Sequence, residues 1–112
     1  MWLFTRIGFF SIVQKEGQSY LTVRTRVEAD LDRLRQQYMP ELSETLHRTG
    51  SDYLFRATIS KEAFSAGLQR IGQDINYSNF KHTVSREMGS NRAHIYYKVW
   101  SILTQLERTK DD

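Results

Sequence analysis

The sequence of 112 residues contains no cysteine. Disulfide bonds, thiolate zinc sites, iron–sulfur clusters and cysteine nucleophiles are therefore excluded. There is one proline, and the six glycines occur singly. The chain thus has neither a proline-rich segment nor the glycine-rich loop that cradles a phosphate group.

A long hydrophobic run is also missing. The most apolar stretch, residues 1–13, is interrupted by Arg6, has no basic segment before it and is followed by no small-residue cleavage site. We therefore expect neither a membrane span nor a secretion signal, and a cytoplasmic location is favoured.

Catalytic and metal-binding motifs are absent as well. The sequence lacks G-x-S-x-G and H-E-x-x-H, and its three histidines lie in separate segments at His47, His82 and His94. Without two ligands on one turn of helix, no metal site is predicted, and we expect no cofactor. A non-catalytic binding protein is favoured over an enzyme. A small enzyme without a recognisable motif is the weaker alternative, and it would place a histidine against a carboxylate in a pocket.

What the chain does contain is enough apolar surface for one core. Hydrophobic residues make up 39%, aromatic residues 12% and charged residues 26% of the sequence. This composition is typical of a folded protein, and two cores would leave each half too small to bury much surface. The sequence predicts a single domain over residues 1–112.

The first half of the chain favours strands, with one helix. Residues 2–13 are rich in aromatic and β-branched side chains, residues 20–27 alternate strictly, and the break between them contains Gly17, so a hairpin is predicted. Residues 28–39 have helical spacing and end at Pro40. Residues 42–48 are ambiguous between a helix and an edge strand, and we assign a weak strand.

The second half favours one more strand and then helices. Residues 53–59 alternate, with Tyr53 on the same side as Phe55, Ala57 and Ile59. Ser60 is a predicted N-cap for a helix that Gly72 could end. Two further helices follow, the last with an apolar stripe from Ile95 to Leu106.

These elements predict an α+β fold with an antiparallel or mixed sheet of three to four strands. The order ββαββα corresponds to a circularly permuted ferredoxin-like sheet with strand order 1-2-4-3 and both helices on one face. One or two additional C-terminal helices are expected beyond it.

The net charge of +3 is unevenly distributed. Residues 1–27 carry four basic and one acidic residue, residues 28–52 three basic and six acidic, and residues 53–112 nine basic and six acidic. Such a pattern indicates distinct charged faces, although an ordinary solvated surface also produces it.

A basic face is predicted on the sheet. If Val23, Val27 and Ala57 face the helices, alternation places another set on the opposite face: Tyr20, Arg24, Arg26, Leu54 and Arg56. Guanidinium groups suit phosphates, and aromatic rings stack on bases, so these residues are a candidate surface for single-stranded nucleic acid or another polyanion. Alternatively, the C-terminal helices cover this face, and the arginines pair with carboxylates such as Glu28, Asp30 or Glu107.

The aromatic C-terminal segment has two interpretations. Tyr96, Tyr97 and Trp100 suit core packing, but a helix that is apolar on most of its circumference could also form a homodimer seam or bind another protein. A protein-interaction or homo-oligomeric module is therefore the second functional hypothesis.

Several strings together resemble a family of small uncharacterised bacterial proteins: Met1-Trp2, Gly8-Phe9-Phe10-Ser11-Ile12-Val13, Val23-Arg24-Thr25-Arg26, Asp52-Tyr53 with Phe55-Arg56, Tyr77-Ser78-Asn79-Phe80-Lys81 and Val99-Trp100. The resemblance spans almost the full chain and implies a bacterial, cytoplasmic protein, with no activity or cofactor to carry over.

The resemblance also draws attention to Tyr77, Asn79 and Lys81. Asn79 is a predicted helix cap, Tyr77 a core anchor and Lys81 an exposed residue. The functional alternative is that these residues line a pocket for a polar ligand.

Overall fold

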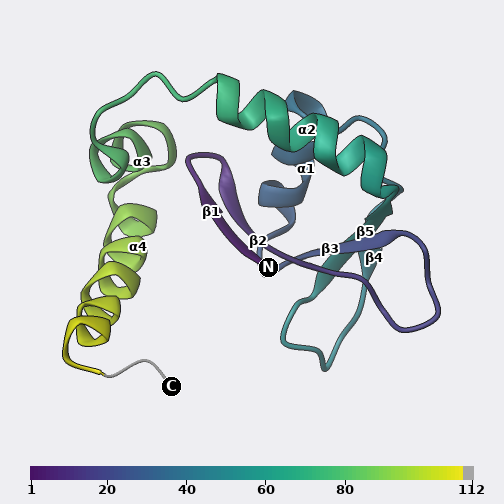
Figure 1. The fold of residues 1–112 in the computed structure, drawn as a ribbon, viewed down its shortest axis with the longest axis horizontal. Coiled ribbons are helices and arrows are strands. Elements are labelled where there is room, and N and C mark those ends of the chain that lie inside the picture. Colours follow the sequence, from purple (N-terminus) through teal and green to yellow (C-terminus); the bar gives the residue numbers. More distant parts are fainter. Residues whose placement is uncertain (110–112) are drawn as a thin grey trace. The chain divides into compact units, whose positions relative to one another are not determined.

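The computed structural model describes residues 1–109 (Figure 1). The sequence predicts one domain, and the contacts within the structure group the chain into two compact units, of which the first is Met1–Asn76 and the second begins at Tyr77. Each unit is described by itself below.

The first unit contains one antiparallel sheet of five strands. They are β1 (Trp2–Thr5), β2 (Gly8–Val13), β3 (Leu21–Thr25), β4 (Leu46–His47) and β5 (Phe55–Ile59). Their order across the sheet is β1-β2-β3-β5-β4. The predicted α+β class is confirmed, whereas the sheet has five strands instead of three to four.

The additional strand arises because residues 2–13 form a hairpin instead of one strand. The chain reverses at Arg6 and Ile7, so that Thr5 pairs with Gly8. The Thr5 hydroxyl holds this turn, since its Oγ1 accepts hydrogen bonds from the N–H groups of Ile7 and Gly8, each at 3.1 Å, and donates to the Gly8 carbonyl at 2.8 Å. Side-chain capping of this kind satisfies the backbone groups that a tight turn leaves unpaired.

Two helices pack on one face of the sheet. Helix α1 (Glu28–Gln37) lies against β2, β3 and β5, and α2 (Lys61–Gln73) lies in the same layer (Figure 1). The strands contribute five buried residues to the core, which are Phe10, Ile12, Val23, Ala57 and Ile59, and the turn between β1 and β2 contributes Ile7. The helices and the segment after α1 contribute Leu31, Leu34, Tyr38, Met39, Leu42 and Phe64. Burial of these apolar side chains is the main stabilising term of this unit.

The ends of these elements follow local capping chemistry. The Ser60 side chain accepts a hydrogen bond from the Ala63 N–H at 3.1 Å, which confirms the predicted N-cap of α2. Helix α2 continues one residue past Gly72, to Gln73. Val27, predicted to face the helices, is instead 41% exposed, because β3 ends at Thr25 and Val27 is the N-cap residue of α1.

The ambiguous segment 42–48 is mostly extended, with only Leu46 and His47 in the strand β4. Ser43 attaches the preceding residues to the sheet edge, because its N–H donates to the Thr58 carbonyl at 2.9 Å and its Oγ accepts from the Thr58 N–H at 2.9 Å. The edge is thus closed by a very short strand and a side chain.

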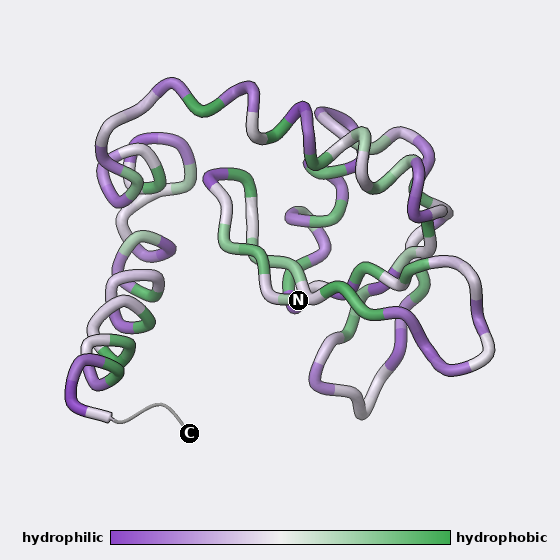
Figure 2. The backbone as a smooth tube through the Cα atoms, in the orientation of Figure 1, coloured by the Kyte–Doolittle hydropathy of each residue, from purple (hydrophilic) through white to green (hydrophobic). Residues whose placement is uncertain are grey.

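The second unit consists of α3 (Phe80–Met88), α4 (Ser90–Leu103) and the 3-10 turn η1 (Thr104–Arg108). Between the two helices, Phe80 stacks on Tyr96 with ring centroids 5.9 Å apart, and Val84 is fully buried. Figure 2 shows hydrophobic and hydrophilic residues alternating along α4. Within residues 1–109, no helix is long and apolar enough to span a membrane.

Candidate polyanion-binding face of the sheet

The sheet has a second face that neither α1 nor α2 covers. Strand pairing places on it the side chains that alternate with the core residues, a set that we call the arginine face: Trp2, Phe4, Phe9, Ser11, Val13, Thr22, Arg24, Leu46, Arg56 and Thr58. Two of the predicted site residues, Arg24 and Arg56, are in this set, and Arg26 and Tyr20 flank β3 at its two ends.

Arg24 and Arg56 lie directly opposite each other on β3 and β5. Like charges in this position destabilise a sheet unless something compensates them. Within residues 1–109, neither arginine forms an ion pair with a carboxylate, and neither does Arg26. Asp30, one of the carboxylates considered above as a partner, is instead paired with Arg33 at 2.5 Å.

Arg56 is the more unusual of the two residues, because it is only 8% exposed. Its guanidinium donates to the Ser51 Oγ at 3.0 Å and to the Tyr53 carbonyl at 3.3 Å, both neutral acceptors, and its Nε has no hydrogen-bond partner. Burial lowers the pKa of Arg56, and the nearby charges of Arg48 and Arg24 lower it further. The site therefore holds a desolvated positive charge with no counter-ion from the described chain.

Arg24 and Arg26 surround one aromatic ring. The Cζ atoms of Arg24 and Arg26 lie 4.7 Å and 5.1 Å from the centre of the Tyr53 ring, and Arg24 also donates to the Ser11 Oγ at 2.6 Å. Cation–π contacts of this kind orient a guanidinium without neutralising it. Like that of Arg56, the Nε of Arg24 has no partner.

The position of Tyr53 corrects one sequence prediction. Tyr53 was expected to share the apolar face with Phe55 and Ala57, but its ring lies beneath Arg24 and Arg26 on the arginine face. Strand β5 begins only at Phe55, so the two-residue alternation does not extend back to Tyr53.

Tyr20 lies at the border of the face. It occupies a bend just before β3 and is 39% exposed, so its ring is accessible to a ligand but is not held by strand pairing. Arg48 is exposed in the loop between β4 and β5 and contributes to the positive potential at Arg56.

The candidate residues named from the sequence do not include three aromatic side chains of this face. Phe4 and Phe9 stack with ring centroids 4.4 Å apart, and Trp2 meets Phe9 edge-on at 5.8 Å. We call these three side chains the aromatic ridge. The turn at Arg6 and Ile7 explains it, because a hairpin there places residues 2, 4, 9 and 11 on one face.

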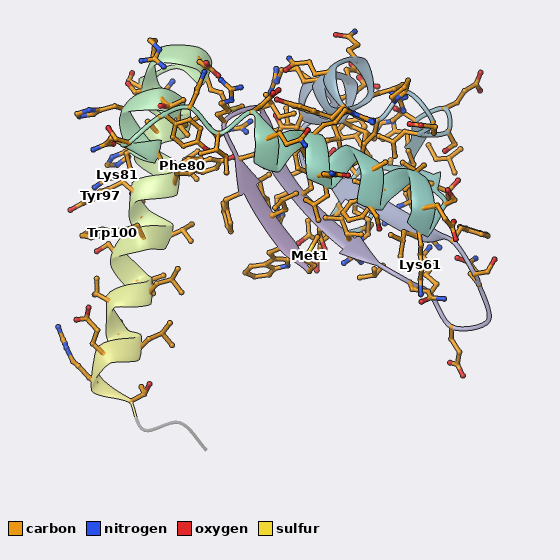
Figure 3. All side chains as sticks on the ribbon, turned by 45° about the horizontal axis from the view of Figure 1, so that its top comes forward. Met1, Lys61, Phe80, Lys81, Tyr97 and Trp100 are labelled. Atoms are coloured by element: carbon orange, nitrogen blue, oxygen red, sulfur yellow. The ribbon has the colours of Figure 1, made fainter. Side chains whose placement is uncertain are left out.

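The second predicted site lies in the second unit. The Asn79 side chain accepts a hydrogen bond from the His82 N–H at 2.9 Å and caps α3, and the Tyr77 ring lies 6.1 Å from that of Phe80. The Lys81 ammonium lies over Trp100 at 4.5 Å and over Tyr97 at 5.4 Å (Figure 3). These contacts give each residue a structural role within its own unit.

Two of the three histidines form ring contacts. His47 stacks on Phe55 and His94 on Tyr97, and none of the three imidazole rings is hydrogen-bonded to a carboxylate within residues 1–109. No cluster of histidine, aspartate and glutamate side chains in this part of the chain could hold a metal ion.

Comparison with known proteins adds no assignment. No protein-family model matches the chain, and no curated protein or solved structure matches it either.

Proposed function

We propose that the chain is a non-catalytic binding domain whose arginine face contacts single-stranded nucleic acid or another polyanion. The observation that carries the proposal is the buried guanidinium of Arg56, which lies opposite Arg24 and has no carboxylate partner in residues 1–109. An anion bound beside these two residues would compensate both the desolvation and the repulsion between them.

A phosphodiester backbone suits this site better than a single small anion. Arg24 lies on β3, Arg26 just after its end, Arg48 in the loop before β5 and Arg56 on β5. A ligand with several regularly spaced negative charges could therefore contact more than one of these arginines. Guanidinium groups also form paired hydrogen bonds to phosphate oxygens.

The proposal extends to the fold and origin of the chain. The order β2-β3-β5-β4, with α1 and α2 on one face, supports assignment to a permuted ferredoxin-like sheet with one additional edge strand. We also propose a cytoplasmic bacterial protein of the family that its motifs resemble.

Replacing Arg24 and Arg26 together with alanine tests this function. We expect affinity for a labelled single-stranded oligonucleotide to fall more than tenfold. The slope of log K against log salt should become shallower by about 1.4, twice the ~0.7 expected per phosphate contact on a single strand. Fluorescence anisotropy at salt concentrations from about 50 to about 200 mM measures both the affinity and the salt dependence.

A charge-matched control is available in Lys61→Ala with Lys98→Ala, which removes two exposed positive charges from α2 and α4 instead of the sheet. This control should keep nearly the full affinity. Loss of binding in both double variants would indicate a non-specific effect of net charge, and unchanged binding in the Arg24/Arg26 variant would reject the proposal.

A second candidate function is self-association through α4 and the turn η1 that follows it. Ile95, Val99 and Ile102 of α4 and Leu106 of η1 are spaced four, three and four residues apart, and three of these side chains are exposed: Ile95 by 56%, Ile102 by 57% and Leu106 by 65%. A stripe of this kind is typical of a helix that packs on a second helix.

This candidate predicts a concentration-dependent mass. Multi-angle light scattering over a hundredfold dilution should show a dimer that dissociates, and Ile102→Glu should give a monomer at every concentration because it places a charge in the seam. Lys98→Glu changes charge on the same helix outside the stripe and serves as the control. A wild-type protein that is monomeric throughout would eliminate this candidate.

A further inference from the structure

The loop that joins β4 to β5, residues 48–54, lies against the guanidinium group of Arg56 (Figure 1). Both of its contacts come from groups without charge. The Ser51 Oγ accepts a hydrogen bond from the Arg56 Nη2 atom at 3.0 Å, and the Tyr53 carbonyl oxygen accepts from the same atom at 3.3 Å. Phosphate oxygens take positions of this kind when an arginine binds a phosphate group. The loop therefore occupies part of the guanidinium that a phosphate ligand needs.

A local turn holds Ser51 in this position. Its Oγ also accepts a hydrogen bond from the Tyr53 N–H at 3.3 Å, and the Arg48 N–H closes the loop by donating to the Leu54 carbonyl at 2.8 Å. Gly50 has a φ of +75°, a backbone conformation that favours glycine. Ser51 is half-buried, but most of the loop is exposed. A short exposed segment of this kind opens locally at a small cost in free energy.

The contact with Ser51 compensates the charge of Arg56 only in part. Arg24, opposite Arg56 in the sheet, and Arg48 both lie close enough to act on this charge. A hydrogen bond to a charged acceptor is roughly twice as strong as one to a neutral acceptor. Exchange of the Ser51 hydroxyl for a phosphate oxygen would therefore be favourable, because the guanidinium keeps a hydrogen bond and gains a counter-ion.

We infer that Ser51 marks the anion subsite of the arginine face: a phosphate oxygen of the ligand takes the place of the Ser51 Oγ on Arg56, and the loop moves away from the guanidinium when the ligand binds. The inference rests on the proposed function and deepens it, because it assigns one phosphate position and the residue that competes for it. The closed loop reduces the apparent affinity in proportion to the fraction of molecules in which it is open.

Two substitutions of Ser51 that differ in charge test this exchange. Ser51→Asp and Ser51→Asn both keep an oxygen that can accept from the Tyr53 N–H, since either side chain forms this type of turn. Ser51→Asp gives Arg56 a permanent counter-ion, so affinity for a labelled single-stranded oligonucleotide should fall by about tenfold, whereas Ser51→Asn should stay within about twofold of the wild type. Ser51→Asp should also melt at a higher temperature than Ser51→Asn, because it neutralises a buried charge. Fluorescence anisotropy and thermal unfolding by circular dichroism measure the two effects.

Ser51→Ala should act in the opposite direction. Without the hydroxyl, the unliganded protein loses a hydrogen bond to Arg56 and the ligand has no competitor, so affinity should rise about threefold. Thr49→Asp is the control for charge, because it places the same charge at an exposed position of the same loop. This control should lower affinity only about twofold and leave the melting temperature unchanged.

Inorganic phosphate separates a subsite for one phosphate group from attraction to a whole strand. At constant ionic strength, it should raise the melting temperature of the wild type and of Ser51→Asn, because both leave Arg56 without a counter-ion. It should not raise that of Ser51→Asp. An equal rise in Ser51→Asp and Ser51→Asn would contradict the exchange at Arg56.

Failure of the subsite and failure of the proposed function give different results. If Ser51→Asp loses no more affinity than Ser51→Asn or Thr49→Asp, the subsite is rejected, and loss of binding in the Arg24/Arg26 variant would still support the polyanion face. If the wild type does not bind the oligonucleotide, both are rejected. A melting temperature of Ser51→Asp no higher than that of Ser51→Asn would also reject the subsite, because the carboxylate would then not compensate Arg56.

Discussion

Replacing Asp30 with alanine should lower the free energy of unfolding by about 3 kcal/mol, a large loss for a unit of this size. Asp30 is 2% exposed, and its carboxylate accepts hydrogen bonds from the Phe9 N–H at 3.1 Å and from Arg33 at 2.5 Å. Arg33 in turn donates to the Ile7 carbonyl at 2.8 Å. The substitution removes a charged acceptor from two donors at once, and hydrogen bonds to charged groups are the stronger ones.

The contact between Asp30 and the hairpin is close enough to require glycine at position 8. A Cβ atom on Gly8 would lie 2.6 Å from the Cβ of Asp30, well inside van der Waals contact. Loss of Asp30 should therefore loosen the β1–β2 hairpin from α1, and this hairpin carries the aromatic ridge.

Urea unfolding followed by circular dichroism measures the effect. Asp32→Ala is the matched control, because this carboxylate lies on the same helix, is 50% exposed and pairs with Arg35 at 3.3 Å. An exposed pair of this kind contributes less than about 1 kcal/mol. If Asp30→Ala were no more destabilising than Asp32→Ala, the hydrogen bonds from the hairpin to α1 would not be a significant source of stability.

The role of Asp30 illustrates why part of the fold was not predictable. An acidic residue in the first turn of a helix is expected from the helix dipole alone, and that interpretation accounts for its position without any tertiary contact. Its partner Phe9 lies 21 residues earlier in the chain. Only the packing of α1 against the hairpin brings them together.

Local sequence patterns predicted the strands with clear alternation and two of the helix caps. The alternation in β3 and β5 and the capping residues Ser60 and Asn79 all appear at the expected places. These features depend on residues that are close in the sequence, so local sequence patterns are sufficient to predict them.

The hairpin of residues 2–13 was missed for a related reason. One of its faces packs in the core and the other carries the aromatic ridge, so both faces are apolar and the alternation that marks a strand disappears. A run without alternation gives no indication of where a strand turns. Because the turn could not be located from the sequence, the side chains of the aromatic ridge could not be assigned to one face.

The sequence predicts that the arginines form a cluster, but it does not predict whether a carboxylate pairs with them. Alternation and neighbouring strands are sufficient to place Arg24 opposite Arg56. Whether a carboxylate reaches them depends on side chains from distant segments, and Asp30 pairs with Arg33 on its own helix instead. The absence of a counter-ion within residues 1–109 is therefore a tertiary property.

Replacing Arg56 with methionine should separate stability from binding. Methionine has similar length, fills the same space and removes a buried charge that burial, Arg48 and Arg24 all disfavour. Replacement of buried charged groups by apolar ones is often neutral or stabilising by a few kcal/mol, so we expect the free energy of unfolding to rise by about 1 kcal/mol, even though the hydrogen bonds to Ser51 and Tyr53 are lost. Oligonucleotide affinity should fall more than tenfold in the same variant.

A rise in stability together with a loss of affinity is the result expected for a binding residue. If Arg56 had a structural role alone, its replacement would make the protein less stable. Arg48→Met is the control: Arg48 is exposed, so its loss should change stability by less than about 0.5 kcal/mol and weaken binding only moderately. Phosphate at constant ionic strength should also raise the melting temperature of the wild type more than that of Arg56→Met, because only the wild type retains the buried cation that an anion stabilises. A variant that is clearly less stable than the wild type and still binds with full affinity would assign Arg56 a structural role and remove the main support for the polyanion site.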